Sequence, residues 1–281
     1  MITEIESLIT KITDEIKKRT DVAVIGLSGG ADSTLVACLC LKALGRDSVY
    51  GIHLPYGDTD RQKFNSRSQL LASKLGIKNV LIPVGNICNT IDAHSGPALQ
   101  SLENPNFKYP TYQISLVNSG NTRSRVRMCL LYSLCHELGD TLKKRTRVIG
   151  TGNPSEDYIG YDTKGGDALA DFFPIGQLFK SEVYQLLDYF KDSGLISEDL
   201  IDRTPSAGLW ENQSDEKELG YSYNEMEPAI KYLLDSSTPK PSGAVALTRF
   251  EEVCKFVEDR HKANSHKHEA PYVISVRNFC K

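Results

Sequence analysis

A short apolar segment that runs directly into a Ser/Gly-rich turn constrains the fold more than any other feature of the chain. Residues 22–27, Val-Ala-Val-Ile-Gly-Leu, fit a strand that is buried on both faces. The turn that follows, Ser28 to Ser33, reads Ser-Gly-Gly-Ala-Asp-Ser, and a helical pattern runs from about Asp32 to Leu44 before Gly45. A buried strand, a glycine-rich turn and a helix in this order indicate the first unit of a parallel α/β sheet.

The same alternation of strand and helix patterns continues along the chain. We predict further strands at residues 48–54, 79–84 and 146–151, and helices at residues 3–19, 61–75, 123–138, 180–191, 223–235 and 245–262. Residues 85–119 contain Gly96, Pro97 and two further prolines, and are predicted to be an irregular excursion. Together with the Gly/Asp-rich residues 152–178, this excursion is a candidate lid. The pattern predicts an α/β fold: a doubly wound parallel sheet with helices on both faces, in a single domain spanning residues 1–281.

Composition excludes several classes of protein. The net charge of -3 over 281 residues argues against a general nucleic-acid binder. No apolar run approaches the ~20 residues of a membrane-spanning helix, and charged residues interrupt the N-terminal segment throughout, unlike a signal peptide. The seven cysteines contain no CxxC pair, which predicts free thiols in a reducing cytoplasm instead of zinc ligands or disulfides.

The Ser28–Ser33 turn, called the phosphate loop below, has the chemistry of an anion site. Glycines let backbone N–H groups approach an anion, and the start of a helix adds unpaired donors and a positive dipole. The hydroxyls of Ser28 and Ser33 add two more donors. Asp32 would repel a phosphate unless a cation lay between them, so Asp32 is a candidate Mg²⁺ ligand. The loop has neither the GxxxxGK[ST] nor the GxGxxG pattern. The alternative to an anion site is that these residues only cap a helix after a tight turn.

The loop and its flanks resemble the pyrophosphatase loop of the N-type ATP enzymes, which cleave ATP to an adenylate and pyrophosphate. GMP synthetase, asparagine synthetase, tRNA-thiolating enzymes and NAD synthetase belong to this group. The resemblance assigns ATP binding to Gly26, Leu27, Ser28, Gly29, Gly30, Ala31, Asp32 and Ser33.

Four further segments and a dipeptide favour one member of the group. They are GNTRSRVRM at residues 120–128, GTGNPSE at 150–156, TKGGDALAD at 163–171, PSAGLW…QSDEKELG at 205–220, and His266-Lys267. In this order they resemble the ammonia-dependent NAD synthetases over about residues 20–268, which implies an adenine nucleotide alpha hydrolase-like fold. Residues 86–119 are unusual for that family in length and composition.

The residues themselves support part of this resemblance. Three arginines within five residues suit an anionic ligand. Arg123 and Arg127 share one helical face and Arg125 points elsewhere, so the three cannot all serve one ligand. Lys180 begins a predicted helix, where a positive charge is poorly placed unless an anion lies nearby. A polar loop after a strand, as at residues 150–156, is where open α/β sheets bind ligands.

The resemblance implies a role for each matching residue. ATP contacts fall on Thr151, Lys180 and Ser206. The dinucleotide contacts fall on Arg125, Lys164, Asp171, His266 and Lys267. Mg²⁺ ligands fall on Asp32 and Glu156, and the catalytic roles on Lys180 and Asp171.

The implied activity is that of a ligase converting deamido-NAD, ATP and ammonia to NAD, AMP and pyrophosphate through an adenylated nicotinate. Mg²⁺ is the implied cofactor and a homodimer the implied assembly. No amidase domain precedes the loop, so free ammonia is the expected nitrogen donor unless a separate subunit delivers it. Asp167 or Asp171 is a candidate to deprotonate ammonium. Two alternatives stay open: another pyrophosphatase-loop ligase that modifies a nucleotide or tRNA, and a regulatory module that binds ATP without turnover.

Overall fold

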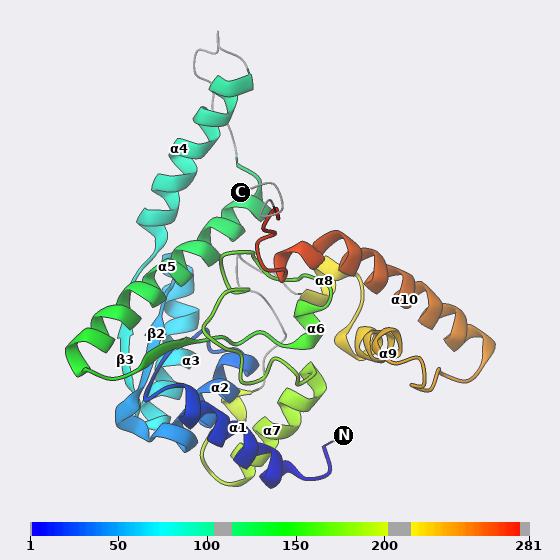
Figure 1. Ribbon diagram of the computed structural model, residues 1–281, viewed down its shortest axis with the longest axis horizontal. Helices are drawn as coiled ribbons and strands as arrows, with labels where there is room; N and C mark the ends of the chain where they lie inside the picture. The colour runs from blue at the N-terminus through cyan, green and yellow to red at the C-terminus, as the bar shows by residue number, and fades with distance from the viewer. Residues whose placement is uncertain (1, 104–113, 202–214, 276–281) are drawn as a thin grey trace.

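Four parallel strands form the centre of the protein. The computed structural model describes residues 2–103, 114–201 and 215–275. The sheet has the order β3-β2-β1-β4 (Figure 1), and its strands are β1 (Val22–Gly26), β2 (Val49–His53), β3 (Lys78–Leu81) and β4 (Thr146–Ile149). Every neighbouring pair is parallel. The predicted parallel sheet is therefore confirmed, with β3 and β4 each shorter than predicted.

Strand β1 is buried on both faces because helices cover both sides of the sheet. Val24 pairs with Tyr50 of β2 and with Val148 of β4. Successive side chains of a strand point to opposite faces. Ala23 and Ile25 accordingly join one hydrophobic cluster and Val24 joins another. This confirms the predicted doubly wound arrangement.

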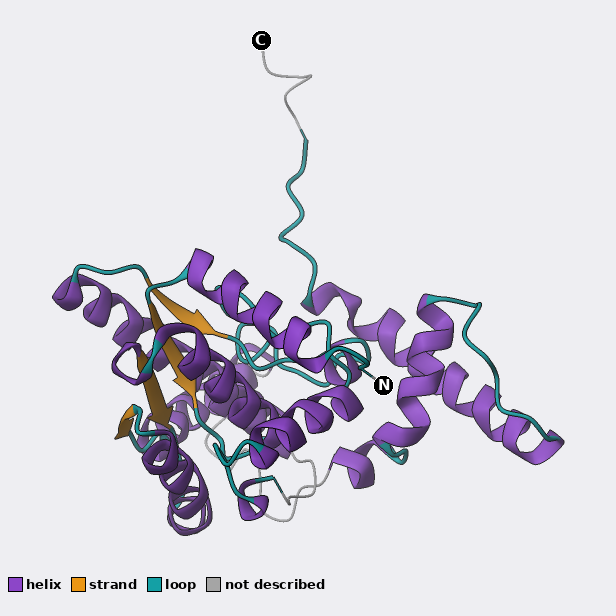
Figure 2. Cartoon of the chain, turned by 90° about the horizontal axis from the view of Figure 1, so that it is seen from below, coloured by secondary structure: helices purple, strands orange, loops and turns teal. Residues whose placement is uncertain are grey.

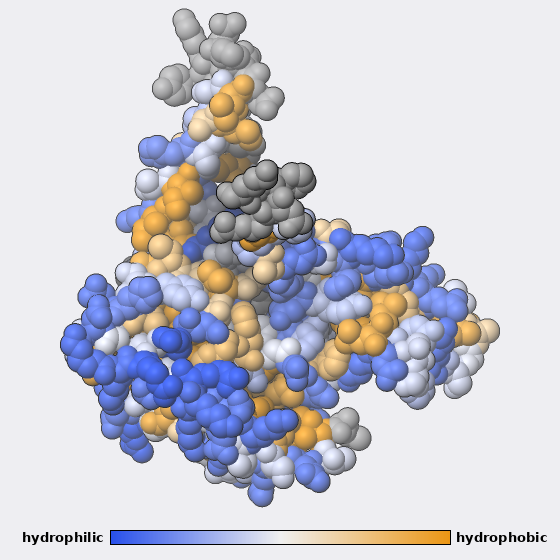
Figure 3. Space-filling view, viewed as in Figure 1, coloured by the Kyte–Doolittle hydropathy of each residue, from blue (hydrophilic) through white to orange (hydrophobic). Residues whose placement is uncertain are grey.

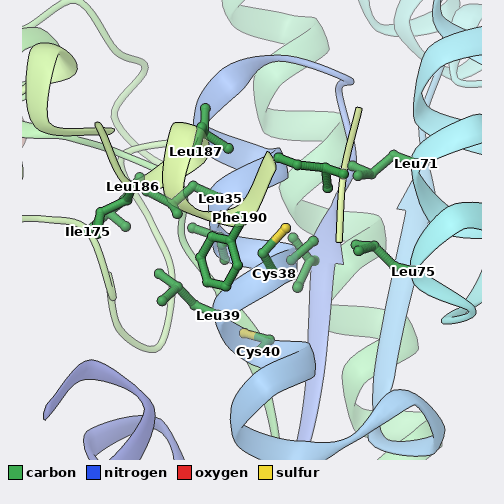
Figure 4. Packing of buried hydrophobic residues seen from close by; sticks show 14 of the residues in the cluster. Leu35, Cys38, Leu39, Cys40, Leu71, Leu75, Ile175, Leu186, Leu187 and Phe190 are labelled. Carbon is green, nitrogen blue, oxygen red and sulfur yellow. The ribbon is translucent and has the colours of Figure 1, made fainter. Parts of the chain in front are cut away.

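The first cluster packs α1 (Ile5–Arg19), α2 (Ala31–Leu44) and α7 (Lys180–Asp192) on one face of the sheet, with the end of α3 (Asp58–Leu75) at its edge. Figure 4 shows Leu35 and Leu39 of α2 against Leu186 and Phe190 of α7. Burying one such side chain stabilises the fold by about 1.5–3 kcal/mol. Packing along their length holds α2 and α7 together, which brings the first turns of both helices to the same edge of the sheet.

The second cluster lies on the other face, under α5 (Leu116–Leu142) and the start of α4 (Gly85–Glu103). Here the prediction of an irregular excursion at residues 85–119 was wrong. Residues 85–103 form a helix in spite of Pro97, and α5 begins seven residues before the predicted start at Arg123. Cys88 is buried against α5 and anchors the first turns of α4. Pro97, which has no backbone N–H to donate, lies in the later, exposed part of the helix, where its effect is tolerated.

A third cluster joins α6 (Pro154–Asp157), α8 (Asp215–Leu219), α9 (Tyr223–Leu234) and α10 (Ala244–Asn264). The long helices α9 and α10 lie on the far side of the molecule from the sheet (Figure 1 and Figure 2). The buried residues of this cluster include Ile159, Met226, Ile230 and Val257. Short 3-10 helices occupy Arg46–Ser48, Glu198–Leu200 and Ser265–Lys267. Among the helices that the structure describes, none combines the length and the apolar composition needed to cross a bilayer.

The strand order places a binding crevice between β1 and β4. The chain moves from β1 through β2 to β3 in one direction, whereas β4 lies on the other side of β1. Open α/β sheets bind ligands at the carboxyl ends of strands where the order reverses in this way. The phosphate loop follows β1 and the loop at residues 150–156 follows β4, so both lie at this crevice.

Candidate active site

The phosphate loop wraps around the first turn of α2. Gly29 has a φ of 73°, a conformation that favours glycine, and a Cβ there would lie 3.2 Å from Cβ of Arg67. The hydroxyl oxygens of Ser28 and Ser33 lie 3.0 Å apart. Gly30 is the N-cap of α2, and no side chain in the described part of the chain caps the helix. The first amides of α2 therefore offer donors to an anion.

A cavity of about 250 Å³ lies beside this loop. Its walls come from the phosphate loop, the carboxyl ends of β1, β2 and β4, and residues of α5. The cavity is lined by these residues for which the sequence predicted contacts with ATP or metal: Gly26, Leu27, Ser28, Gly30, Ala31, Asp32, Ser33, Thr151, Glu156 and Lys180. The structure thus brings together residues that are about 150 positions apart in the chain.

Three charged side chains from separate elements meet in the cavity. Asp32 lies in the first turn of α2, Glu156 in α6, and Lys180 is the first residue of α7. The ammonium nitrogen Nζ of Lys180 lies 2.6 Å from Oδ2 of Asp32 and 2.9 Å from Oε1 of Glu156. The Lys180 side chain is only 6% exposed, so solvent screens these ion pairs weakly.

Burial and charge act in opposite directions on this triad. Burial disfavours the Lys180 ammonium, but Asp32 and Glu156 together outweigh that effect and raise the pKa of Lys180 above its ordinary value. Burial also raises the pKa of Glu156, and the Asp32 charge adds to that rise while Lys180 opposes it. The two carboxylates therefore stabilise a positive charge placed between them, such as the Lys180 ammonium.

The geometry of the two carboxylates fits a hard divalent cation such as Mg²⁺. Asp32 and Glu156 both direct an oxygen at Nζ of Lys180, so the two carboxylates already converge on one positive charge. Hard cations prefer carboxylate oxygens and commonly bridge to phosphates. Asp32 and Glu156 are thus the pair of cavity carboxylates around Lys180 that could hold the metal.

Asn153 and Tyr223 make supporting contacts that are not predicted from the sequence. The Asn153 side chain is fully buried; its Nδ2 donates to Asp32 Oδ1 at 3.0 Å, and its Oδ1 accepts from the Ser155 and Glu156 amides. An Asn followed by Pro is a recognisable helix start, so this cap could have been found in the sequence. The hydroxyl of Tyr223 lies 3.4 Å from Glu156 Oε1 and donates to Asp215 at 3.0 Å. Nothing in the local pattern at Tyr223 indicates that contact.

The arginine segment divides as predicted. The guanidinium of Arg123 lies over the ring of Tyr56, with 3.5 Å between its carbon and the ring centroid, and Arg127 donates to the carbonyl of Leu54 at 3.0 Å. Arg125 points elsewhere and donates to the carbonyl of Lys164 at 3.1 Å. Arg123 and Arg127 thus support the end of β2, while Arg125 joins a separate group of basic residues.

That second group contains the residues predicted to contact the dinucleotide. The Lys164 ammonium donates to the carbonyl of His266, next to its backbone contact with Arg125. Lys267 donates to the carbonyls of Gly160 at 2.6 Å and Asp162 at 2.9 Å. Arg125, Lys164, His266 and Lys267 therefore lie close together, outside the lining of the cavity.

The two remaining predicted residues differ in placement. Asp171 is exposed and accepts a hydrogen bond from the Val148 amide at 2.7 Å, which ties its segment to β4. It does not line the cavity that the described residues enclose. Ser206 lies outside the described residues.

The chain is similar to known proteins in both sequence and structure. The sequence model of the NAD synthase family matches residues 3–271. The NH(3)-dependent NAD(+) synthetase of Methanocaldococcus jannaschii is 35% identical over 271 residues, which cover 95% of each chain. That of Pyrococcus furiosus is 34% identical over 267 residues, covering 95% of this chain and 93% of the relative.

Two solved structures are similar over nearly the whole chain. The structure of NMN synthetase from Francisella tularensis has a TM-score of 0.70 and 30% identity, with 96% of each chain covered. The NH3-dependent NAD synthetase from Campylobacter jejuni has a TM-score of 0.69 and 26% identity, with 96% of this chain and 99% of that chain covered. With its phosphate loop, its cavity and this extent of similarity, the chain belongs to the NAD synthase family.

Proposed function

We propose that this protein is an ammonia-dependent ligase that converts deamido-NAD, ATP and ammonia to NAD, AMP and pyrophosphate. The observation that carries the proposal is the meeting of Asp32, Glu156 and Lys180 beside the phosphate loop in one cavity. Family membership supports it, as do curated relatives named as NH(3)-dependent NAD(+) synthetases. The free thiols of the described cysteines favour a cytoplasmic location.

The first step activates a carboxylate that is a poor electrophile. A nicotinate carboxylate oxygen attacks the α-phosphorus of ATP, and the bond to the β-phosphate oxygen breaks. The amides at the start of α2 and the hydroxyls of Ser28 and Ser33 receive the departing pyrophosphate. Lys180 stabilises the negative charge that builds on the leaving group. When bound by Asp32 and Glu156, Mg²⁺ supplies further positive charge at the phosphate oxygens.

The second step forms the amide. Ammonia attacks the acyl carbon of the adenylate, and AMP departs with the carboxylate oxygen that had been joined to phosphorus. Ammonium must first lose a proton. Of the two predicted candidates, Asp167 lines the cavity and accepts hydrogen bonds from Ser124 Oγ and the Thr163 amide, both at 2.8 Å. Asp171 is instead engaged with β4. Because Asp167 lines the cavity and Asp171 does not, we favour Asp167 as the group that deprotonates ammonium.

The group of Arg125, Lys164, His266 and Lys267 is the proposed contact for the dinucleotide. Guanidinium and ammonium groups suit the pyrophosphate and carboxylate of that substrate. These side chains lie next to one another but outside the cavity lining. A substrate that spans from this group to the phosphate loop would present its nicotinate end to the adenylation site.

We also propose that the protein is a homodimer that pairs through α4 and α5. Figure 1 shows α4 projecting from the rest of the molecule, and Figure 3 shows apolar residues along it. The exposed apolar side chains on α4 and the first turn of α5 include Ile87, Ile91, Leu99, Leu102, Leu116 and Val117. An apolar surface of this kind marks an interaction site, and a two-fold dimer buries the same surface on both copies.

The similarity to an NMN synthetase favours a second candidate, in which the acceptor is nicotinate mononucleotide. Both candidates share the adenylation chemistry and differ in whether an adenosine moiety must be bound on the substrate. The curated relatives named above favour the dinucleotide.

One assay tests both candidates. Purified protein is incubated with MgATP, ammonium and either deamido-NAD or nicotinate mononucleotide, and the amide products and AMP are quantified by liquid chromatography. We expect NAD and AMP in equal amounts, a higher kcat/KM for the dinucleotide, and little product when glutamine replaces ammonium. A preference for the mononucleotide would select the second candidate. ATP binding without AMP formation would instead identify a nucleotide-sensing module.

A further inference from the structure

The proposed function depends on two side chains that no local structure holds together. Glu156 lies in the short helix α6, and Lys180 lies more than twenty residues later, at the start of α7. Ser155 precedes the first of these residues and Ser181 follows the second. The contacts that join Ser155 to Ser181 therefore help to set the distance between the Glu156 carboxylate and the Lys180 ammonium, which also form a direct ion pair.

A carboxylate on a third helix contacts both serines, in addition to a direct hydrogen bond between the two segments. Glu227 lies on α9 and is 4% exposed. Its Oε1 accepts hydrogen bonds from Ser155 Oγ at 2.8 Å and from the Ser181 amide at 3.0 Å, and its Oε2 accepts from Ser181 Oγ at 2.6 Å. Ser155 Oγ in turn accepts from the Lys180 amide at 2.9 Å.

We infer that Glu227 is a positioning residue, which holds Glu156 and Lys180 in register for the adenylation step. This inference rests on the proposed function. Glu227 lies in the layer behind the cavity and has no place in its lining. Hydrogen bonds to an ionised carboxylate are shorter and stronger than neutral ones, so three of them restrain the backbone on both sides of the site.

The side chains around Glu227 indicate that its carboxylate is there to position neighbouring groups, because the packing itself requires no polar residue. Its neighbours on α9, Met226, Ala229 and Ile230, are fully buried in the third hydrophobic cluster. An apolar residue would satisfy packing at this point without the desolvation cost of a carboxylate. The carboxylate instead accepts from the Ser181 amide in the first turn of α7, where the helix dipole favours a negative charge.

The same helix contacts the site a second time. Tyr223 lies one turn before Glu227, and its hydroxyl is 3.4 Å from Oε1 of Glu156. Residues four apart share a helix face. Thus α9 contacts the site at two points. Tyr223 contacts the Glu156 carboxylate, and Glu227 contacts Ser155 and Ser181.

The substitution Glu227→Gln tests the inference, because an amide keeps the shape but offers only one acceptor oxygen for the donors of Ser155 and Ser181. We expect kcat to fall by roughly 10-fold or more and the Mg²⁺ concentration for half-maximal rate to rise, the scale typical of losing a supporting contact behind a metal ligand. Isothermal titration calorimetry with MgATP gives a readout without turnover, and the affinity should weaken in parallel.

Glu225→Gln is the matched control. Glu225 lies on the same helix and its carboxylate accepts from the Ser222 amide, but its partners are Ser222 and Arg249, away from α6 and α7. This variant should lose some thermal stability and keep the wild-type kcat and Mg²⁺ dependence. If both variants lower activity only in proportion to their loss of folded protein, Glu227 has a merely structural role and the inference is wrong.

The role of Glu227 can still be tested if the variant does not fold or if the wild-type protein makes no NAD. If Glu227→Gln does not fold, the double variant Ser155→Ala/Ser181→Ala replaces it, and unchanged kcat and MgATP affinity in that variant overturn the inference. If the wild-type protein makes no NAD, the proposed function fails, whereas the calorimetric comparison of MgATP binding still decides the role of Glu227.

Discussion

Lys180 occupies the positive end of α7, a position that is unfavourable for an ammonium by itself. The two carboxylates at 2.6 and 2.9 Å explain why it is there. At the scale of single residues, the site is a small set of opposed charges from three elements, and the loss of one charge should change the balance among the others.

Replacement of Asp32 by Asn tests that balance. The variant removes one candidate Mg²⁺ ligand and one of the two partners of Lys180, so kcat/KM for ATP should fall by roughly 100-fold or more, the scale for removing a preorganised electrostatic contact. Steady-state kinetics across a Mg²⁺ series measures the effect. Asp14→Asn, a change of the same kind in an exposed ion pair of α1, is the control and should have no effect. A wild-type rate at every Mg²⁺ concentration in Asp32→Asn would remove Asp32 from the proposed mechanism.

His53, at the end of β2, should make the stability of the ligand-free protein depend on pH. The side chain is 2% exposed, its Nδ1 lies 2.8 Å from Ser68 Oγ, and its Nε2 is buried without a hydrogen-bond partner among the described residues. Burial lowers the pKa of His53 below the ordinary value of 6.5. Between the two pKa values the unfolded chain binds more protons than the folded one, so the contribution of His53 to stability is present above pH 6.5 and is lost as the pH falls.

The variant His53→Leu isolates this effect. The free energy of unfolding, measured by urea denaturation between about pH 5 and 8, should fall less steeply toward low pH in the variant than in the wild type. Parallel curves for His53→Leu and the wild type would show that His53 titrates alike in the folded and unfolded chains.

Among the helices, α4 is notable because apolar side chains are exposed along its length. Leu102 is 80% exposed on it. If α4 and α5 form the proposed dimer interface, Leu102→Asp should weaken dimerisation by about 2 kcal/mol, roughly 30-fold, as expected for an apolar contact at an interface centre. Sedimentation velocity measures the change. Val245→Asp on α10, where Val245 is 86% exposed, should leave the dimer intact. A wild-type protein that sediments as a monomer would contradict the proposed interface.

The strands and most helices could be predicted because their apolar patterns are strong and their ends carry glycines, as at Gly45 and Gly76. The helix at residues 85–103 could not, because Gly96 and Pro97 indicate a break, whereas burial of Cys88 against α5 holds the first turns in helical form. Local patterns report propensity, and here tertiary packing outweighed it.

The candidate site shows the same limit. The phosphate loop, Glu156 and Lys180 were recognisable from their residue types and from resemblance to a known family. Their convergence depends on how α2 packs against α7, and the roles of Tyr223 and Glu227 depend on the position of α9. These contacts join residues far apart in the chain, and no spacing rule within one segment encodes them.

At the scale of the whole molecule, the cavity lies where two packing units meet. The sheet and its helices supply Asp32 and Lys180, and the cluster of α6, α9 and α10 supports Glu156 from the other side. A ligand that contacts both units would bind only their assembled arrangement. This makes the site sensitive to the contacts of α9 as well as to its own residues.

If the protein adenylates the nicotinate carboxylate before amidation, one carboxylate oxygen is transferred to AMP, and an isotope label can follow that oxygen. Deamido-NAD labelled with ¹⁸O in its carboxylate is converted with MgATP and ammonium, and the nucleotide products are analysed by mass spectrometry. We expect AMP that carries one ¹⁸O for each NAD formed, with unlabelled pyrophosphate. Formation of ADP with ¹⁸O in inorganic phosphate, or of unlabelled AMP, would contradict this mechanism.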